Sequence, residues 1–298
     1  MKEKAYISYL KALEGRHPLT NEQRKDLTSI SIGSEGEEYF ESVLNNIGVE
    51  NKLRDFEFGS RNHIQADFIV ASSNKVLVFE IKHYSNEWYF EGDYIKNSFG
   101  MKYQSPVLQI QRIRNELQEI FYKTEINRNI EPIIIFTNPH FSLIGNRPRD
   151  IQLLLPHELS KLFRIIHPNQ SIEDQAVIKT IQQFENIHST YYQKEIYVEF
   201  EKIKKGLKCP NCRKMFTVKR IERQKKFDCY YCHARINTEE VLYFNLVELY
   251  TLKQAPFSMK EAIAWCENMS IFSIKRVCSK KFISDEVRYK KYKLSDKS

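Results

Sequence analysis

The sequence predicts an α/β domain with a mixed sheet flanked by helices, followed by a four-cysteine module and a small helical module at the C-terminus. Three observations support this fold class. Segments of helical and strand periodicity alternate over the first half of the chain. Two Cys-x-x-Cys pairs follow after residue 206, and two short amphipathic segments lie within residues 257–282. The 298 residues are enough for two or three domains with hydrophobic cores.

Each element of the α/β domain is predicted from its apolar pattern, in chain order. A short helix comes first and is followed by a linker at 16–18. The next helix, over 36–47, carries apolar residues at helical spacing, and a longer amphipathic helix covers 106–121. Five strands and a last helix complete the domain, at 52–58, 68–71, 75–82, 132–137, 151–155 and, for the helix, 156–166. This order is typical of a mixed sheet covered by helices.

The chain divides into five predicted parts. Residues 1–30 form an N-terminal helix and linker, 31–167 the α/β domain, 168–205 a mostly helical connector, 206–240 the cysteine module and 241–298 a basic C-terminal module. The longest apolar runs are far too short to cross a bilayer, and the N-terminus lacks the apolar stretch of a secretory signal. We therefore expect a cytoplasmic protein that does not bind membranes.

Charge is distributed unevenly along the chain, whose formal net charge is +8. Residues 1–201 hold 23 Lys/Arg and 28 Asp/Glu, whereas residues 202–298 hold 23 Lys/Arg and 10 Asp/Glu. An acidic front half is suited to binding cations, and a basic back half to binding a polyanion such as nucleic acid. The alternative is a solvated basic surface without a partner.

The most informative segment, 64–82, has the pattern of a β-hairpin. If its turn has two residues, 73–74, opposed residues have numbers that sum to 147. Asp67 then lies directly opposite Glu80, and Lys82 shares their face of the sheet. A slip of the register by one residue would instead place the two acids on opposite faces.

The two facing acids lie on strands that are mostly apolar, so the sequence predicts that they are buried. Buried carboxylates that face each other repel and are costly to desolvate. A hard divalent cation bound by both would offset that cost, and Lys82 would help. The alternative is an ion pair between Glu80 and Lys82 with Asp67 capping a turn, which predicts exposure to solvent.

Glu37 is a further candidate, within the glycine-containing segment 33–37. Ser34 and Glu37 have the spacing of a capping box, which places them at the start of the helix. Glu37 also precedes Phe40 by three residues and therefore lies at the edge of the buried face, where Gly36 allows close approach of another backbone. Spacing alone favours the cap.

Four short motifs, in this order, resemble the nuclease-related domain (NERD) family, which is related to the PD-(D/E)xK nucleases. They are Gly33-x-x-Gly36-Glu37, Gln65-Ala66-Asp67, Glu80-Ile81-Lys82-His83-Tyr84 and Ser105-Pro106-Val107-Leu108-Gln109. The resemblance covers roughly residues 5–145, and the rest of the chain is similar to the tail of some members. Ala66 replaces a usual Ile and His83 a usual Asn, and neither change removes a charged group. The implied fold is a PD-(D/E)xK-like mixed sheet flanked by helices.

The resemblance implies a metal-dependent nuclease. Asp67 and Glu80 would bind Mg²⁺ or Mn²⁺ together with the carbonyl of Ile81. Lys82 would orient the attacking water or stabilise the developing charge. The expected partner is nucleic acid, with DNA favoured over RNA.

The resemblance also assigns roles to three further residues. Glu37 is the acid that the family carries on this helix, so a catalytic role and the capping role are evenly supported. Gln65 and Gln109 would position the phosphate or support the metal ligands. Ordinary polar hydrogen bonding is the alternative for both glutamines.

Two Cys-x-x-Cys pairs, separated by sixteen residues, are a strong signature of a zinc ribbon: Cys209, Cys212, Cys229 and Cys232. Four thiolates leave no open position on Zn²⁺, so the ion would be structural. Disulfides would need an oxidising compartment, and a thioredoxin-like redox site would have one pair in a βαβ unit. His233 as a replacement ligand is a further alternative. Cys266 and Cys278 are expected to be buried free thiols.

Basic and aromatic residues interleave around the cysteine pairs. Residues 202–226 carry eleven Lys/Arg and one acid, a composition that suits contacts with phosphates. We expect Phe216 in the core of the module. Tyr230 and Tyr231 either join that core or stack on bases.

Two short helices are predicted within 257–282. Ser258 and Glu261 have the spacing of a capping box at the start of the first helix, and the second helix carries several basic residues. The pair is similar to a helix-turn-helix, whose second helix enters the major groove of DNA. A small packing domain is the alternative.

Three functions are compatible with these observations. The first is a metal-dependent nuclease acting on DNA. The second is a non-catalytic nucleic-acid-binding or regulatory protein built on a nuclease fold. The third is a protein-interaction adaptor whose zinc ribbon docks a partner. The oligomeric state is left open, a homo-oligomer included.

Overall fold

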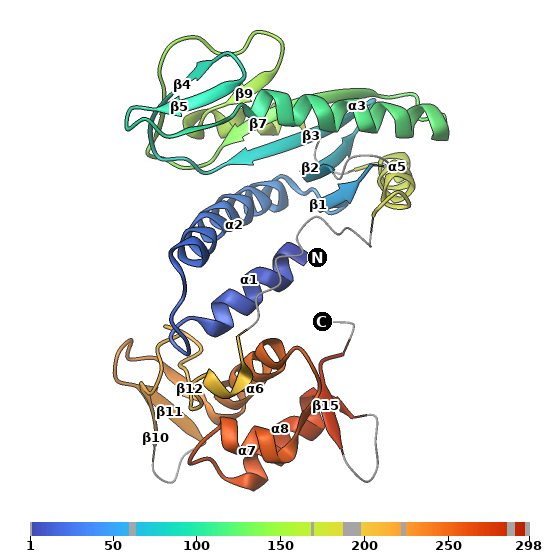
Figure 1. Cartoon of the computed structure of the whole chain (residues 1–298). Helices are drawn as coiled ribbons and strands as arrows, with labels where there is room; N and C mark the ends of the chain where they lie inside the picture. Colours follow the sequence, from blue (N-terminus) through green and yellow to red (C-terminus); the bar gives the residue numbers. More distant parts are fainter. Residues whose placement is uncertain are drawn as a thin grey trace. The chain divides into compact units, whose positions relative to one another are not determined.

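The computed structural model describes residues 2–59, 64–167, 170–186, 198–221, 225–284 and 290–295. The chain forms two compact units, one of Thr28–Tyr191 and the other of Met1–Leu27 with Tyr192–Ser298. Each unit is described by itself (Figure 1). The five-part division predicted from the sequence stays a prediction, because contacts alone do not test which parts fold independently.

A mixed five-stranded sheet forms the centre of the 28–191 unit, as the sequence predicted. Its strands are β1 (Lys52–Phe58), β2 (Ile64–Ser72), β3 (Lys75–Lys82), β7 (Asn129–Phe136) and β9 (Gln152–Leu154). They lie in the order β1-β2-β3-β7-β9, antiparallel from β1 to β3 and parallel from β3 to β9. The central β3 is buried along most of its length, which explains why its sequence is apolar on both sides.

Helices cover both faces of this sheet (Figure 1). On one face, helix α3 (Pro106–Thr124) packs Ile110, Ile113 and Leu117 into a core that contains Val76 and Val78 of β3. On the other face, helix α2 (Asn21–Ile47) packs Phe40, Leu44 and Ile47 into a core that contains Leu77 and Phe79. Side chains of β3 therefore alternate between the two layers, as strand geometry requires.

Helix α2 begins at Asn21, well before the predicted start near residue 36. The prediction that Ser34 and Glu37 cap this helix is therefore wrong. The capping box is formed by Thr20 and Gln23, since Thr20 Oγ1 accepts the Gln23 amide at 3.1 Å and Gln23 Oε1 accepts the Thr20 amide at 2.9 Å. Thr20–Gln23 and Ser34–Glu37 both have the spacing of a capping box. Because the helix starts at the first of them, the backbone between the two remains hydrogen-bonded within a single helix.

A second, four-stranded sheet follows β3 and was not predicted. Its strands are β4 (Asn86–Glu91), β5 (Tyr94–Asn97), β6 (Lys102–Gln104) and β8 (Phe141–Leu143), in the order β6-β5-β4-β8. These strands have three to six residues and expose many of their side chains. Such short segments lack the regular apolar alternation from which longer strands are predicted.

The end of this unit is helical. The predicted helix over 156–166 is the 3₁₀ helix η1 (Pro156–Lys161) followed directly by α4 (Leu162–Ile165). Helix α5 (Ile172–Gln182) lies in the segment predicted as a mostly helical connector. Residues 187–197 of that connector lie outside the described residues.

The other unit combines helices with a small ribbon. Its elements are α1 (Lys2–Leu13), the 3₁₀ turn η2 (Phe200–Lys202), β10 (Val218–Arg220), β11 (Lys226–Cys229), β12 (Arg235–Asn237) and α6 (Thr238–Lys253). Strands β10, β11 and β12 form one antiparallel sheet, and α1 packs against α6. The central helix α6 was not predicted from the sequence.

The C-terminal part contains the two predicted short helices, α7 (Met259–Trp265) and α8 (Ile271–Lys281). Ser258 and Glu261 form the predicted capping box, with the Glu261 amide donating to Ser258 Oγ at 3.3 Å. A small sheet of β13 (Phe257–Ser258), β15 (Lys291–Lys293) and β14 (Ile283–Ser284) packs beside these helices.

A buried ionic cluster fixes the start of the chain to this unit. Arg16 is fully buried and donates to Glu248 at 2.9 Å and to Asn245 at 2.8 Å. Lys208, also fully buried, donates to the second oxygen of Glu248 at 3.0 Å. Arg16 falls within the predicted linker, yet it is a core residue. Its charge is tolerated because Glu248 and several carbonyl oxygens pair with it.

Among the residues that the structure describes, no helix is both long and apolar enough to cross a membrane. This agrees with the short apolar runs of the sequence. The cytoplasmic location stays a prediction.

Candidate active site and four-cysteine cluster

The candidate active site is built on the hairpin of β2 and β3. Phe68 pairs with Phe79 and Ser72 with Lys75, so opposed residues have numbers that sum to 147, as predicted. Ser73 in the turn has a φ of 58°, a value that tight hairpin turns require. The same register places Asp67 of β2 against the Glu80 end of β3.

Asp67 bridges the two strands through its side chain. Its Oδ2 accepts the backbone amide of Ile81 at 2.7 Å, and the residue is partly buried. Burial raises the pKa of the Asp67 carboxyl, although the charge of Lys82 and the Ile81 amide act in the opposite direction. The carboxylate therefore lies beside the end of β3 at an energetic cost that a bound cation would reduce.

Glu80 is fully buried, as predicted for an acid on this strand. Its Oε1 accepts a hydrogen bond from Lys82, whereas its Oε2 is buried and has no partner among the described residues. Burial, together with repulsion from Asp67, raises the pKa of Glu80 to about 8. Without a cation, this carboxyl therefore holds a proton at neutral pH.

Lys82 lies between Glu80 and helix α3. Besides its bond to Glu80, its Nζ donates to Oε1 of Gln109 on α3 at 3.3 Å. Burial alone would lower the pKa of Lys82, but the negative charges of Glu80 and Asp67 outweigh burial and raise it. Lys82 is thus a permanent cation, and Gln109 is one of the two groups that orient it.

Glu37 lies inside helix α2 and faces the same acids. Burial raises the pKa of Glu37 to about 7, with further contributions from the negative charges of Asp67 and Asp55. Arg54 counters this effect and approaches Glu37 Oε2 at 3.4 Å. An acid with this pKa can gain or lose a proton near neutral pH.

Two residues of the site, Arg54 and Asp55, were missed by the sequence analysis. Arg54 pairs with Glu37 and donates to Glu41 at 2.5 Å, so it holds the acidic side of α2 against β1. Asp55 accepts a hydrogen bond from Gln65 at 3.4 Å and has a positive φ of 50°. Gln65 thus bonds this neighbouring acid. Two charged residues in a strand-like segment give no sequence signal by which they could be singled out.

Glu37, Asp67 and Glu80 do not form a compact three-acid cluster. Among the described residues, the four cysteines are the one group of three or more possible metal ligands whose ligand atoms all lie within 4.8 Å of one another. The carboxylate oxygens of Glu37, Asp67 and Glu80 therefore do not all lie that close together. Carboxylate oxygens are the donors that Mg²⁺ and Mn²⁺ prefer. The unpartnered Oε2 of Glu80 fits this chemistry.

Gly36 allows α2 to approach the sheet closely, as the sequence suggested. A Cβ atom at this position would lie 2.7 Å from Cβ of His83 and 2.8 Å from Oγ1 of Thr137. Those two side chains contact each other, with His83 Nδ1 and Thr137 Oγ1 2.8 Å apart. The glycine thus fixes the distance at which Glu37 stands from the hairpin.

Replacing Gly36 by Val should force α2 away from the sheet and destabilise the protein by about 1–3 kcal/mol, the usual cost of overpacking. Thermal unfolding monitored by circular dichroism would measure the loss. Gly33→Val on the same helix is the control, because a Cβ at Gly33 meets nothing within 4 Å. Equal losses in the two variants would show that helix propensity, and not the close approach, is responsible.

The four predicted zinc ligands converge in the second unit. The sulfur atoms of Cys209, Cys212, Cys229 and Cys232 all lie within 4.8 Å of one another. The Cys209–Cys232 and Cys212–Cys229 separations are 3.8 and 3.7 Å. Sulfurs placed about 2.3 Å from a tetrahedral zinc ion are roughly 3.8 Å apart. The cluster can therefore hold zinc, and the distances are much too long for disulfide bonds.

The surroundings of the cluster favour the thiolate at Cys229 and Cys232, whereas burial raises the pKa of Cys209 to about 12. Burial disfavours the charged form of Cys229, but the Thr217 hydroxyl and the amides of Cys232 and Tyr231 outweigh it and lower the pKa of Cys229 to about 6. Asn211 also donates to Cys232 Sγ at 3.4 Å. The remaining cysteines, 266 and 278, are buried free thiols, as predicted.

The aromatic residues near the cluster separate into two groups. Phe227 is buried in the small core beside Cys209 and Cys229. Phe216 was expected in that core, and the prediction is wrong, because its side chain is exposed and lies over Gly206. Two cysteines, Phe227, Ile236 and Val241 fill the small interior. Tyr230 and Tyr231 are also exposed, and Lys214 lies over the ring of Tyr231.

Residues 32–137 match the family model of the nuclease-related domain (NERD). The match contains the candidate catalytic residues and confirms the resemblance drawn from the four sequence motifs. The four-cysteine cluster lies outside the matched segment. No curated protein and no solved structure matches the chain.

Proposed function

Because residues 32–137 carry a nuclease-related domain, we propose that this protein is a metal-dependent nuclease that hydrolyses phosphodiester bonds of DNA. The observation that carries the proposal is Oε2 of Glu80, which is buried and has no partner among the described residues. A buried polar atom without a partner is costly. A divalent cation shared with Asp67 would remove that cost, and it would also offset the repulsion between the two acids.

Asp67 and Glu80 are assigned as the carboxylate ligands of Mg²⁺ or Mn²⁺, with the backbone carbonyl of Ile81 as a third ligand. The Ile81 amide already donates to Asp67, so the backbone of this residue is held beside the site. When bound, the ion would polarise the scissile phosphate and lower the pKa of an attacking water.

The neighbouring residues have separate roles. Lys82 is a permanent cation beside the ligands and stabilises negative charge on the phosphate, while Gln109 and Glu80 hold its ammonium in place. Glu37, whose pKa is about 7, is assigned to accept the proton of the attacking water. Gln65 donates a hydrogen bond to Asp55, and Arg54 forms an ion pair with Glu37. These contacts keep the acids of this site apart from one another.

Zinc held by the four cysteines would be structural, because four thiolates complete its coordination. The ribbon then presents Tyr230 and Tyr231 to solvent, and Lys214 lies 3.5 Å above the ring of Tyr231. Exposed rings among lysines suit base stacking and phosphate contacts. We assign nucleic-acid binding to this ribbon and to the basic segment that follows it.

The proposal is tested by incubating purified protein with single- and double-stranded DNA and RNA in Mg²⁺, Mn²⁺ or EDTA. We expect cleavage that requires the cation and is faster on DNA than on RNA. Binding without cleavage on every substrate would leave a non-catalytic nucleic-acid-binding protein on a nuclease fold. Absence of both binding and cleavage at low salt would favour a protein-interaction adaptor.

A further inference from the structure

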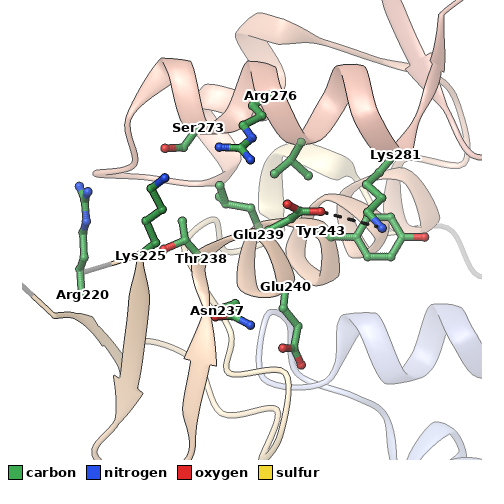
Figure 2. A pocket seen from close by; sticks show the side chains of 12 residues that line it. Arg220, Lys225, Asn237, Thr238, Glu239, Glu240, Tyr243, Ser273, Arg276 and Lys281 are labelled. Carbon is green, nitrogen blue, oxygen red and sulfur yellow. Dashed lines mark ion pairs between the residues drawn. The ribbon is translucent and has the colours of Figure 1, made fainter. Parts of the chain in front are cut away.

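A pocket of about 530 Å³ lies between the four-cysteine ribbon and helices α6 and α8 (Figure 2). The ribbon contributes Arg220, at the end of β10, and Lys225, next to β11. Helix α8 contributes Ser273 and Arg276, and the start of α6 contributes Thr238. All these residues belong to one compact unit, and none belongs to the candidate active site.

Three cationic side chains of this pocket form no ion pair with any residue that the structure describes. Within the described part of the chain, the side chains of Arg220, Lys225 and Arg276 make no hydrogen bond and no ion pair within 4 Å, and Arg276 interacts with Glu239 only at longer range. Lys225 and Arg276 extend from opposite walls into the same space (Figure 2). Like charges gathered in one pocket repel, so their arrangement is relieved when an anion binds between them.

The two acids of the pocket do not supply that anion. Glu239 is paired with Lys280 at 2.7 Å and with Lys281 at 4.0 Å, and the hydrogen bond from Lys280 lowers the pKa of its carboxyl most, with smaller effects of Lys281 and Arg276. Glu240 extends away from the three unpaired cations (Figure 2). The free charge of the pocket is therefore positive.

Uncharged groups of the pocket can also bind an anion. The hydroxyl oxygen of Thr238 is buried, lines the pocket and has no hydrogen-bond partner among the described residues. Asn237, at the N-cap of the sixteen-residue helix α6, does not use its side chain to cap the helix. The positive end of the α6 dipole thus faces the pocket without a side-chain cap. Ser273 adds a second hydroxyl.

We propose that this pocket binds the phosphate group of a nucleotide. Guanidinium and ammonium groups, hydroxyls and a helix N-terminus are the groups with which proteins bind phosphate. The volume falls in the range of about 300–1,000 Å³ that is typical of small-ligand sites, so there is room for more than the phosphate alone. Placing this nucleotide within a nucleic-acid strand rests on the proposed function. A free nucleotide carries the same phosphate group.

The test measures binding of a fluorescent oligonucleotide by anisotropy in EDTA, where no cleavage occurs. The pocket variant carries Arg220→Ala, Lys225→Ala and Arg276→Ala. The control variant carries Lys219→Ala, Lys226→Ala and Lys275→Ala, which replace the neighbour of each pocket residue and remove the same charge. All six side chains are exposed, so both variants should fold, and equal melting temperatures would verify this.

We expect the pocket variant to bind about tenfold more weakly than wild type at moderate salt, and the control variant to lose about threefold or less. The slope of log Kd against log salt should fall by about 0.7–0.9 in the pocket variant, because the pocket holds one phosphate and each lost phosphate contact contributes that amount. Equal losses of affinity in both variants would show that the strand responds to positive charge in general and not to this pocket, which would overturn the proposal. Wild-type affinity in the pocket variant would also overturn it.

Competition identifies the source of the phosphate. If a nucleoside monophosphate displaces the oligonucleotide from wild type but not from the pocket variant, the pocket is a nucleotide-binding site that also accepts free nucleotides. If the oligonucleotide binds through the pocket and a nucleoside monophosphate does not displace it, the phosphate in the pocket belongs to the backbone of the strand. Stronger binding of a poly-glutamate peptide than of the oligonucleotide would overturn the assignment to phosphate. A negative cleavage assay leaves these results standing, since binding is measured without the catalytic cation.

Discussion

Replacing Asp67 by Asn or Glu80 by Gln should lower the rate of Mg²⁺-dependent DNA cleavage about 1,000-fold or more. Each amide keeps the size of the side chain but removes an anionic oxygen that the cation needs. Metal ions contribute several kcal/mol to the stabilisation of such transition states, which corresponds to this loss in rate. Single-turnover cleavage at saturating Mg²⁺ measures the effect.

A second measurement separates loss of the metal from loss of the fold. Glu80 has a pKa of about 8 and is therefore neutral at pH 7 without a cation. Gln at this position is also neutral and can accept the hydrogen bond from Lys82, so Glu80→Gln should keep its melting temperature in EDTA. Addition of Mg²⁺ should raise the melting temperature of wild type and leave that of the variant unchanged.

Glu131→Gln is the matched control for both measurements. Glu131 lies on β7 of the same sheet and pairs with Lys75 at 2.7 Å, so its replacement removes the same charge from a surface ion pair. Cleavage and the Mg²⁺-dependent stabilisation should both persist in this variant. If Glu80→Gln cleaved DNA as fast as Glu131→Gln, the assigned site would be wrong.

The raised pKa of Glu80 also gives metal binding a pH dependence. The cation must displace the proton that Glu80 holds below a pH of about 8. The apparent affinity for Mg²⁺ should therefore rise with pH, about tenfold per unit between pH 6 and 7, and level off above pH 8. Affinity that is constant across this interval would show that Glu80 is ionised before the cation binds.

Removing zinc should unfold the ribbon and lower the melting temperature of its unit by about 10 °C or more. Structural zinc sites bind their ion with about 10–16 kcal/mol, and that energy stabilises the fold. Two of the five buried residues in the core of the ribbon are the ligands Cys209 and Cys229, beside Phe227, Ile236 and Val241, so freeing the ligands disrupts a core that is already small. Cys229→Ser should reproduce the effect. Elemental analysis should find one zinc ion per wild-type chain and less in the variant.

His233→Asn is the control for the zinc prediction. His233 is exposed and has a φ of 58°, a backbone conformation that Asn tolerates well. This variant should retain one zinc ion and the wild-type melting temperature, because the four sulfurs already complete the coordination. Loss of zinc from His233→Asn, with zinc retained in Cys229→Ser, would mean that the histidine is the ligand.

Short-range patterns predicted the parts of the site that depend on local geometry. The hairpin register followed from a two-residue turn, because strand alternation then fixes which residues face each other. The cysteine spacing predicted a four-sulfur cluster for a similar reason, since each Cys-x-x-Cys pair folds into one tight turn. The predicted helix over 106–121 is present as α3, where a regular apolar stripe coincides with a Ser105 cap.

Other features could not be predicted because they depend on contacts that are distant in sequence. Two capping patterns compete for the start of α2, and local spacing does not decide between Thr20 and Ser34. The short strands β4 to β6 are held by pairing with one another rather than by their own pattern. Arg16 looks like a loop residue until Glu248, 232 positions later, is placed against it.

The sequence by itself determined the register of the β2–β3 hairpin, the four-cysteine cluster and the nuclease-related segment, because each is encoded by short motifs along the chain. Only the tertiary structure decided that Glu80 has a buried oxygen without a hydrogen-bond partner among the described residues, that Glu37 lies inside a helix beside Arg54, and that Arg220, Lys225 and Arg276 line one pocket. Burial, pKa and pairing are properties of the surroundings of a side chain. Those surroundings come from distant segments that only the folded chain brings together.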